Sequence, residues 1–181
     1  LSAPVPVWSP ISYRPYQGSN GLQNEIASIV GYGITANQGT NSWIVVSGSF
    51  GVKRLARNTL DGYLANVTLN FGTYTRTTDY IAYDLDDPAG VNTRNTFGGL
   101  AVPGEGGIAE KDSGCPWFVE ENGRDRIVAI GGFIGYFNGS GLTGPLQYGA
   151  FGAGAHLNVY KAWIQATAPV LGDLPSTLTE F

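Results

Sequence analysis

The residues best suited to chemistry lie in one short segment, Lys111-Asp-Ser-Gly-Cys-Pro116. The glycine after Ser113 permits a tight turn that exposes the serine hydroxyl at a surface. In such a turn the backbone N–H groups of Lys111 and Ser113 can converge on one point, as an oxyanion hole requires. Asp112 can bend back and hold the turn through a charge-assisted contact. The segment could present a nucleophilic serine, but Asp-Ser-Gly taken alone more often forms a purely structural turn.

The segments around this turn are predicted to be mainly β-strands. Residues 117–120 and 126–134 form a hairpin, because Asn122-Gly123 between two apolar runs is a strong turn signal. Residues 1–20 are Pro-rich and predict an extended arm, 21–167 the folded domain, and 168–181 a tail. Further strands are predicted at 26–33, 43–46, 52–60, 64–71, 80–85 and 147–155, and one amphipathic helix at 157–166.

The composition favours an all-β domain with many turns. Hydrophobic residues make up 43% of the chain and charged residues 13%, so a sizeable core is possible, and 27 Gly with 10 Pro indicate many turns. The net charge of -4 and the absence of a basic stripe argue against nucleic acid as a partner. The longest apolar run, 127–134, is too short to cross a membrane. Short strands at close spacing followed by a helix suggest a closed β-barrel.

Several landmarks occur in the order found in the trypsin-like (chymotrypsin-fold) serine proteases. The nucleophile motif of that family is Gly-Asp-Ser-Gly-Gly-Pro, and this sequence is similar from Asp112 to Pro116. The resemblance covers 1–166 and is closest to the C-terminal half of bacterial members. Its other landmarks are Leu1-Ser-Ala-Pro-Val, Ser28-Ile-Val-Gly-Tyr-Gly, Gly51-Val-Lys-Arg-Leu-Ala-Arg-Asn, Ile127-Val-Ala-Ile-Gly-Gly-Phe-Ile and Tyr160-Lys-Ala-Trp-Ile.

The resemblance implies the second, six-stranded antiparallel barrel of a two-barrel fold, closed by one C-terminal α-helix. It implies a secreted, extracellular or periplasmic serine endopeptidase that acts on polypeptides without a cofactor or metal. Ser113 would attack the peptide bond, the amides of Lys111 and Ser113 would bind the oxyanion, and Gly114 would support the turn. Asp112 would pair with an amino terminus exposed by cleavage. Lys111 and Cys115 stand where the family has glycines.

The catalytic histidine and aspartate of the family would precede the segment that matches Leu1. The sequence has one histidine, His156, whose position predicts a solvated or helix-capping residue rather than a catalytic one. Since the chain also contains no Met, we expect it to be a processed product or a piece of a longer protein. We therefore expect it to need an N-terminal barrel that carries the base and to be inactive alone.

The resemblance also places a specificity pocket. Gly107 stands six residues before the nucleophile, where trypsin has its acidic residue, so cleavage after Lys or Arg is not expected. Gly132 stands where a substrate-pairing Ser is usual, followed by Phe133. Ile134 would narrow one wall and Gly152 would leave the opposite wall open, which favours small or modest apolar side chains.

The sequence leaves two alternative functions open and contains one further group of residues that could bind a ligand. The chain can be a catalytically inactive protease homologue that serves as a binding module, as the departures at Lys111, Cys115, Gly132 and Ile134 suggest, or an unrelated β-barrel. Asp84, Asp86 and Asp87 form an acidic group that could bind Ca²⁺ through oxygen ligands, but a solvated turn is the favoured interpretation.

Overall fold

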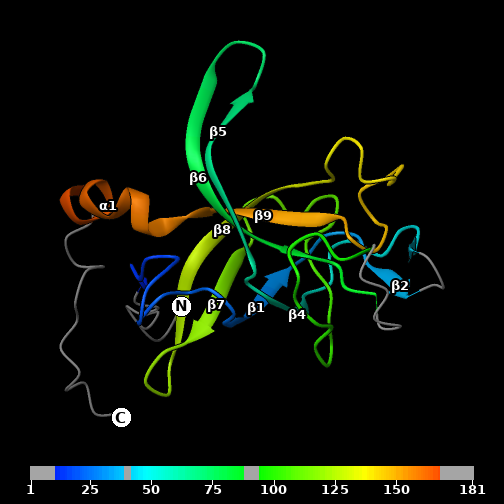
Figure 1. Ribbon diagram of the computed structural model, residues 1–181, viewed down its shortest axis with the longest axis horizontal. Helices are drawn as coiled ribbons and strands as arrows, with labels where there is room; N and C mark the ends of the chain where they lie inside the picture. The colour runs from blue at the N-terminus through cyan, green and yellow to red at the C-terminus, as the bar shows by residue number, and fades with distance from the viewer. Residues whose placement is uncertain (1–10, 39–41, 88–93, 168–181) are drawn as a thin grey trace, which may run out of the picture.

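The computed structural model describes residues 11–38, 42–87 and 94–167, and these form a mostly β structure around one large antiparallel sheet (Figure 1). The sheet has seven strands in the order β4-β1-β7-β8-β9-β6-β5, and β2 and β3 form a separate two-stranded sheet. The strands are β1 (Ile26–Gly31), β2 (Ala36–Gln38), β3 (Trp43–Val45), β4 (Arg54–Thr59), β5 (Gly62–Asn70), β6 (Thr75–Asp84), β7 (Pro116–Glu120), β8 (Asp125–Gly135) and β9 (Phe151–His156).

The β7–β8 hairpin follows directly from its sequence. Asn122 and Gly123 both take positive φ, 56° and 74°, which a two-residue hairpin turn with right-handed strand twist requires. Trp117 and Val119 alternate with less buried neighbours along β7, so one face of the strand enters the core. The predicted hairpin is confirmed.

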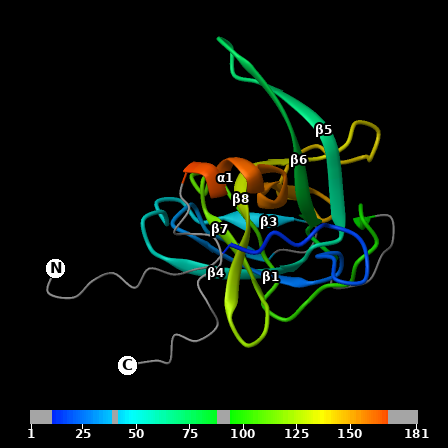
Figure 2. The same ribbon diagram turned by 90° about the vertical axis from the view of Figure 1, so that its left-hand side faces the viewer.

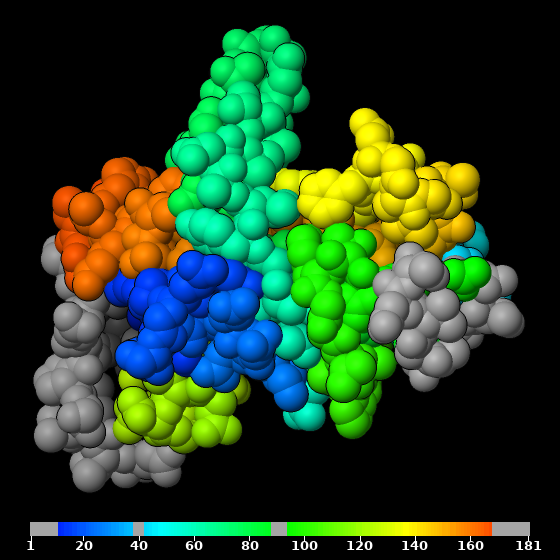
Figure 3. Space-filling model, viewed as in Figure 1, coloured from blue at the N-terminus to red at the C-terminus, as the bar shows by residue number. Residues whose placement is uncertain are grey.

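The β5–β6 hairpin is longer than the sequence pattern suggested. β6 begins at Thr75, five residues before the predicted strand, and the far half of the hairpin projects from the body of the protein (Figures 1 and 2). The space-filling view shows the same projection standing clear of its surroundings (Figure 3). Phe71 and Tyr74 stack at its end with ring centroids 5.0 Å apart. This local aromatic pair and the β5–β6 ladder account for strand formation away from the core.

The sheet is covered on both faces by apolar side chains. The larger cluster includes Ile29, Ile81, Tyr83, Trp117 and Val128, and the smaller one includes Tyr80, Ala82, Phe151 and Ala153. Because neighbours along β6 alternate between the two clusters, Tyr80 and Tyr83 pack on opposite faces.

The expected all-β class is confirmed, but the seven-stranded sheet is not closed into a barrel. β4 and β5 are its two edges, and they follow one another in the chain without pairing. Side-chain hydrogen bonds bridge β4 to β6 instead, since Asn58 Nδ2 donates to Asp84 O at 2.9 Å. The same nitrogen donates to Gly106 O at 3.1 Å, which ties the loop before Ser113 to this edge.

The described part of the arm packs against the sheet. Ser12 N donates to Ile127 O at 2.9 Å, and Tyr16 is buried in the larger cluster. Residues 1–10 of the predicted arm and the predicted tail at 168–181 lie outside the described residues.

The predicted C-terminal helix is present as a short 3₁₀ turn, η2 (Leu157–Tyr160), that runs into α1 (Lys161–Thr167). Within the described part of the chain, no helix has the length and apolar character to span a membrane.

Candidate active site

Two consecutive turns present Ser113 at the surface. Asp112 N donates to Ala109 O at 3.1 Å, and Cys115 N donates to Asp112 O at 3.0 Å. The third residue of each turn has positive φ, 75° at Lys111 and 88° at Gly114. Glycine suits this conformation, whereas a lysine there costs roughly 1–2 kcal/mol. The lysine at position 111 therefore strains the turn.

Within the described residues, the two turns leave three backbone amides without protein partners, those of Glu110, Lys111 and Ser113. Asp112 N, Gly114 N and Cys115 N are all bonded inside the protein, whereas in the described residues Lys111 N and Ser113 N donate to no protein atom. Ser113 itself is exposed. An exposed hydroxyl and unpaired backbone N–H groups therefore occur in the same turn, and these are the kinds of group that an oxyanion site uses.

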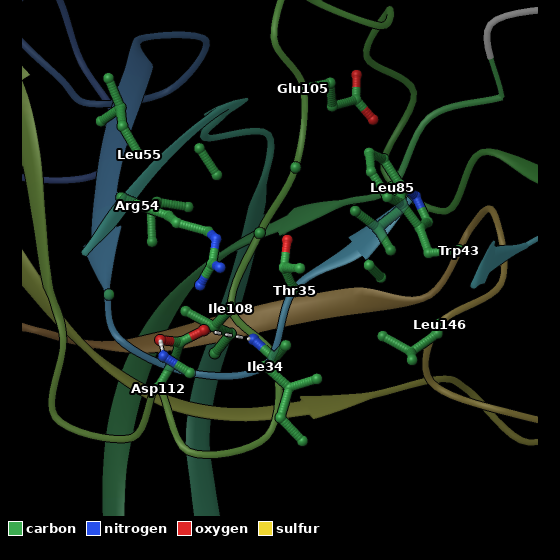
Figure 4. A pocket seen from close by; sticks show the side chains of 18 of the residues that line it. Ile34, Thr35, Trp43, Arg54, Leu55, Leu85, Glu105, Ile108, Asp112 and Leu146 are labelled. Carbon is green, nitrogen blue, oxygen red and sulfur yellow. Dashed lines mark hydrogen bonds between the residues drawn. The ribbon is translucent and has the colours of Figure 1, made fainter. Parts of the chain in front are cut away.

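The Asp112 carboxylate fastens this turn to the end of β1. Oδ1 accepts from Gly33 N at 2.6 Å, and Oδ2 accepts from Ala109 N at 3.0 Å (Figure 4). The carboxylate fits only because its neighbours are glycines: a Cβ on Gly31 would lie 2.0 Å from Oδ1, and one on Gly33 would lie 2.5 Å from Cγ. The sequence predicted a bent-back Asp112 but not that Gly33 would be its partner.

Replacing Asp112 with Asn is expected to destabilise the protein, because an amide NH₂ cannot accept from both backbone N–H groups. Losing one buried acceptor costs about 1–3 kcal/mol, and about 2–4 °C in Tm for each kcal/mol in a chain of this size. Thermal unfolding followed by circular dichroism measures the change. Glu110→Gln is the matched control, since Glu110 is an exposed carboxylate two residues away. Equal Tm values for both variants would contradict the anchoring role of Asp112.

A cavity of about 190 Å³ lies beside Asp112. Figure 4 shows Asp112 and Glu105 toward opposite ends of it, with the Arg54 side chain between them. Trp43 and Leu146 line another part of the wall. The Arg54 guanidinium donates to Ser49 O at 2.7 Å.

Tyr83 occupies the space that Gly107 and Gly152 leave. A Cβ on Gly107 would lie 2.1 Å from the Tyr83 hydroxyl oxygen, and a Cβ on Gly152 would lie 2.2 Å from it. Ile108 N donates to the same oxygen at 2.5 Å, and burial raises the pKa of the phenol. The wall that the sequence analysis expected to be open at Gly152 is therefore filled by a buried tyrosine.

The five residues predicted to line the specificity pocket do not all face the space that Tyr83 fills. Ile134 is paired with Gly152 across the sheet and packs against the cluster that contains Tyr83. Phe133 packs with the cluster on the opposite face, and a Cβ on Gly132 would meet Tyr80 there at 3.2 Å. The structure therefore brings Gly107, Gly152 and Ile134 together around Tyr83, while Gly132 and Phe133 belong to the other face.

No protein-family profile and no curated protein sequence matches this chain. A function for this chain therefore has to be inferred from the geometry of the site.

Neither Cys115 nor His156 is placed for catalysis. Burial, and then the nearby Asp112 charge, raises the pKa of the Cys115 thiol to about 11, so it stays protonated at neutral pH. His156 is 1% exposed, its Nε2 lies 3.0 Å from Arg14 O, and its Nδ1 has no hydrogen-bond partner in the described residues. It makes no side-chain cap to η2. The expectation of a solvated or capping histidine was wrong, because β9 carries the ring into the protein.

The expected solvated turn at Asp84–Asp87 was also wrong for two of its three residues. Asp84 and Asp86 are buried, 0% and 3% exposed, and Asp61 and Glu105 lie beside them. The sequence did not indicate that Asp61 belongs to this acidic group, because 23 positions separate it from Asp84. Only the tertiary structure brings the two residues together. Among the described residues, no three His, Cys, Asp or Glu side chains are arranged to hold a metal ion.

Proposed function

We propose that this chain carries the nucleophile of a trypsin-like serine endopeptidase, with Ser113 as the residue that is acylated. The observation that carries the proposal is the pair of unbonded amides at Lys111 and Ser113, which flank the inward-turned amide of Asp112 beside an exposed hydroxyl.

The chemistry would be acyl transfer. Ser113 Oγ would lose its proton to a general base and form a bond to the carbonyl carbon of the substrate. The negative charge on the carbonyl oxygen would be bound by the Lys111 and Ser113 amides until the C–N bond breaks and the amine leaves with the proton. Water would then hydrolyse the ester by the same steps.

The general base would come from a second barrel that carries the histidine and aspartate. The one histidine of this sequence does not suit the role, because it is buried and contacts the Arg14 carbonyl oxygen. In this proposal the seven-stranded sheet corresponds to the six-stranded barrel of the family, left open between its edge strands β4 and β5, with Asn58 bonding β4 to β6. The enzyme would be secreted, extracellular or periplasmic, with polypeptides as substrates.

Asp112 and the cavity beside it would receive an amino terminus freed by cleavage. Each Asp112 oxygen accepts one hydrogen bond from the backbone, which leaves further lone pairs for an ammonium group. The cavity wall includes Gly31, Gly33 and Asp112, so the carboxylate is reachable from it.

A fluorophosphonate probe tests the proposal, because it reacts only with a serine that is activated by a base. In the native protein, together with its histidine-bearing part, we expect one adduct, and peptide mass spectrometry should locate it on Ser113. Ser47 is the internal control, since it is exposed and outside the turn. An adduct on Ser47 as well, or none on Ser113 in folded protein, would contradict the proposal.

The second candidate is an inactive homologue that binds polypeptides without cleaving them. The strained Lys111 turn and the Tyr83 ring in the expected pocket favour it. The same experiment separates the two functions. Folded native protein that retains peptide binding and resists the probe would be the inactive homologue.

A further inference from the structure

Four carboxyl groups meet at the edge of the sheet where β4, β6 and the loop before Ser113 come together. Asp61 lies in the β4–β5 turn, Asp84 ends β6, Asp86 follows it, and Glu105 belongs to the loop. Both oxygens of Asp61, both of Asp86, and Oδ1 of Asp84 are buried and accept no hydrogen bond in the described structure. An ionised carboxylate in such a place is strongly disfavoured.

The hydrogen bonds that these carboxyls accept within the described residues come from backbone N–H groups. None of the hydrogen bonds or ion pairs that the described residues make to Asp61, Asp84, Asp86 or Glu105 comes from Lys, Arg or His. Arg57 on β4 pairs with the loop through its backbone, and its side chain is exposed. The charged and titratable groups on the surrounding elements are Tyr16 of the arm, Arg57 of β4, Tyr83 of β6, Asp87 after β6, and Arg94 at the start of the loop.

The same carboxyls hold the loop 94–107. Asp84 Oδ2 accepts from Thr96 N at 2.5 Å, and Glu105 accepts from Asp86 N at 2.6 Å and from Val102 N at 3.0 Å. Gly99 packs so closely that a Cβ would lie 2.3 Å from Asp61 Oδ2. The loop therefore rests on the cluster and leads directly to Gly107 and the nucleophile turn.

The cluster titrates far from the ordinary range of carboxyl groups. Burial, and then repulsion from Asp84 and Asp86, raises the pKa of Asp61 to about 8. Burial raises the pKa of Glu105 to about 7 and that of Asp86, which also faces Asp84, to about 6. Burial also raises the pKa of Asp84, while the hydrogen bond from Thr96 N acts in the opposite direction.

We propose that these four residues form a proton-dependent latch on the loop 94–107, in which a protonated Asp61 donates to the free Oδ1 of Asp84. The shared proton gives Asp61 and Asp84 Oδ1 a partner and removes one charge from the cluster. Ionisation restores the repulsion and loosens the loop. This inference is independent of the proposed peptidase activity.

The sign of the pH effect follows from the raised pKa values. An unfolded aspartate titrates near 3.8, so between that pH and about 8 the folded state holds more protons than the unfolded chain at Asp61. Stability from the cluster is therefore complete below about pH 4 and is lost progressively as the pH rises from there to about 8. His156 acts in the opposite direction at acid pH, because burial lowers its pKa. The Tm is expected to be highest in mildly acidic solution.

Thermal unfolding of the 181-residue chain from pH 5 to pH 8.5 at constant ionic strength tests the latch. The wild-type Tm should fall across this range. The Tm of Asp61→Asn should fall less than that of wild type and should be the higher of the two at pH 8.5. The reason is that the asparagine side chain stays neutral and can donate to Asp84. Asp125→Asn, which removes an exposed carboxylate on the β7–β8 hairpin, should follow wild type.

Hydrogen exchange of the wild-type protein supplies a readout that needs no variant. Protection of the Thr96, Asp86 and Val102 amides, corrected for the intrinsic pH dependence of exchange, should fall above pH 6. Protection of Ile34, whose amide donates to Glu110 O, should not change. A Tm that stays level or rises from pH 5 to 8, or millimolar Ca²⁺ that raises the Tm of wild type but not of Asp61→Asn, would overturn the latch.

Discussion

Ser113→Ala is expected to slow peptide hydrolysis by the native protein by a factor on the order of 10⁴ to 10⁶, because no acyl-enzyme can form. The substitution should leave stability within about 0.5 kcal/mol of wild type, since the hydroxyl is exposed and bonds to no described group. Initial rates with a quenched-fluorescent peptide library measure the loss, and a thermal melt confirms that the variant is folded.

Ser47→Ala is the matched control, because it removes an exposed hydroxyl outside the nucleophile turn. Wild-type rates are expected from it. Hydrolysis by Ser113→Ala at the wild-type rate would show that the Ser113 turn is not the catalytic centre of the native protein.

Tyr83→Ala is expected to be the most destabilising single change at the site. Truncating a large buried aromatic side chain costs about 3–5 kcal/mol through lost burial and the cavity left behind. Tyr83→Phe keeps the ring and loses only the bond from Ile108 N, so a cost of about 1–3 kcal/mol is expected. Urea unfolding measures both changes, and the smaller variant keeps the test available if the larger one does not fold.

Tyr80→Ala is the control for position, since Tyr80 is a buried tyrosine on the same strand but on the opposite face. Both alanine variants should lose stability. Only the change at Tyr83 should open space between Gly107 and Gly152, and under the proposed peptidase activity only it should extend cleavage toward larger side chains. Identical cleavage profiles would show that Tyr83 does not limit the pocket.

Local sequence was sufficient for the elements whose form depends on near neighbours. The β7–β8 hairpin follows from alternating burial along 117–120 and from the conformational freedom of Asn122-Gly123. The exposed Ser113 turn follows from Gly114, whose φ of 88° suits few other residues. The hairpin turn and the φ of Gly114 are local properties, although contacts of Asp112 and Gly114 with distant residues hold the Ser113 turn in place.

Strand register and loop packing decide which side chains come together at the site. Tyr83 reaches Gly152 because β6 and β9 pair with these residues opposite each other, and it reaches Gly107 because the loop folds back over β6. Asp112 finds Gly33 across 79 positions of sequence. Neither pairing leaves a periodic pattern in the chain, so neither was predictable from it.

The sequence by itself determined an all-β protein with an exposed serine in a tight turn, because strand alternation and glycine turns are local properties. The tertiary structure alone decided that the sheet stays open, that the space beside Gly107 is filled, and that Asp84, Asp86 and His156 are buried. The physical reason is that burial and charge repulsion are set by which distant segments are brought together. A sequence pattern cannot show that an acidic residue will be enclosed by three others.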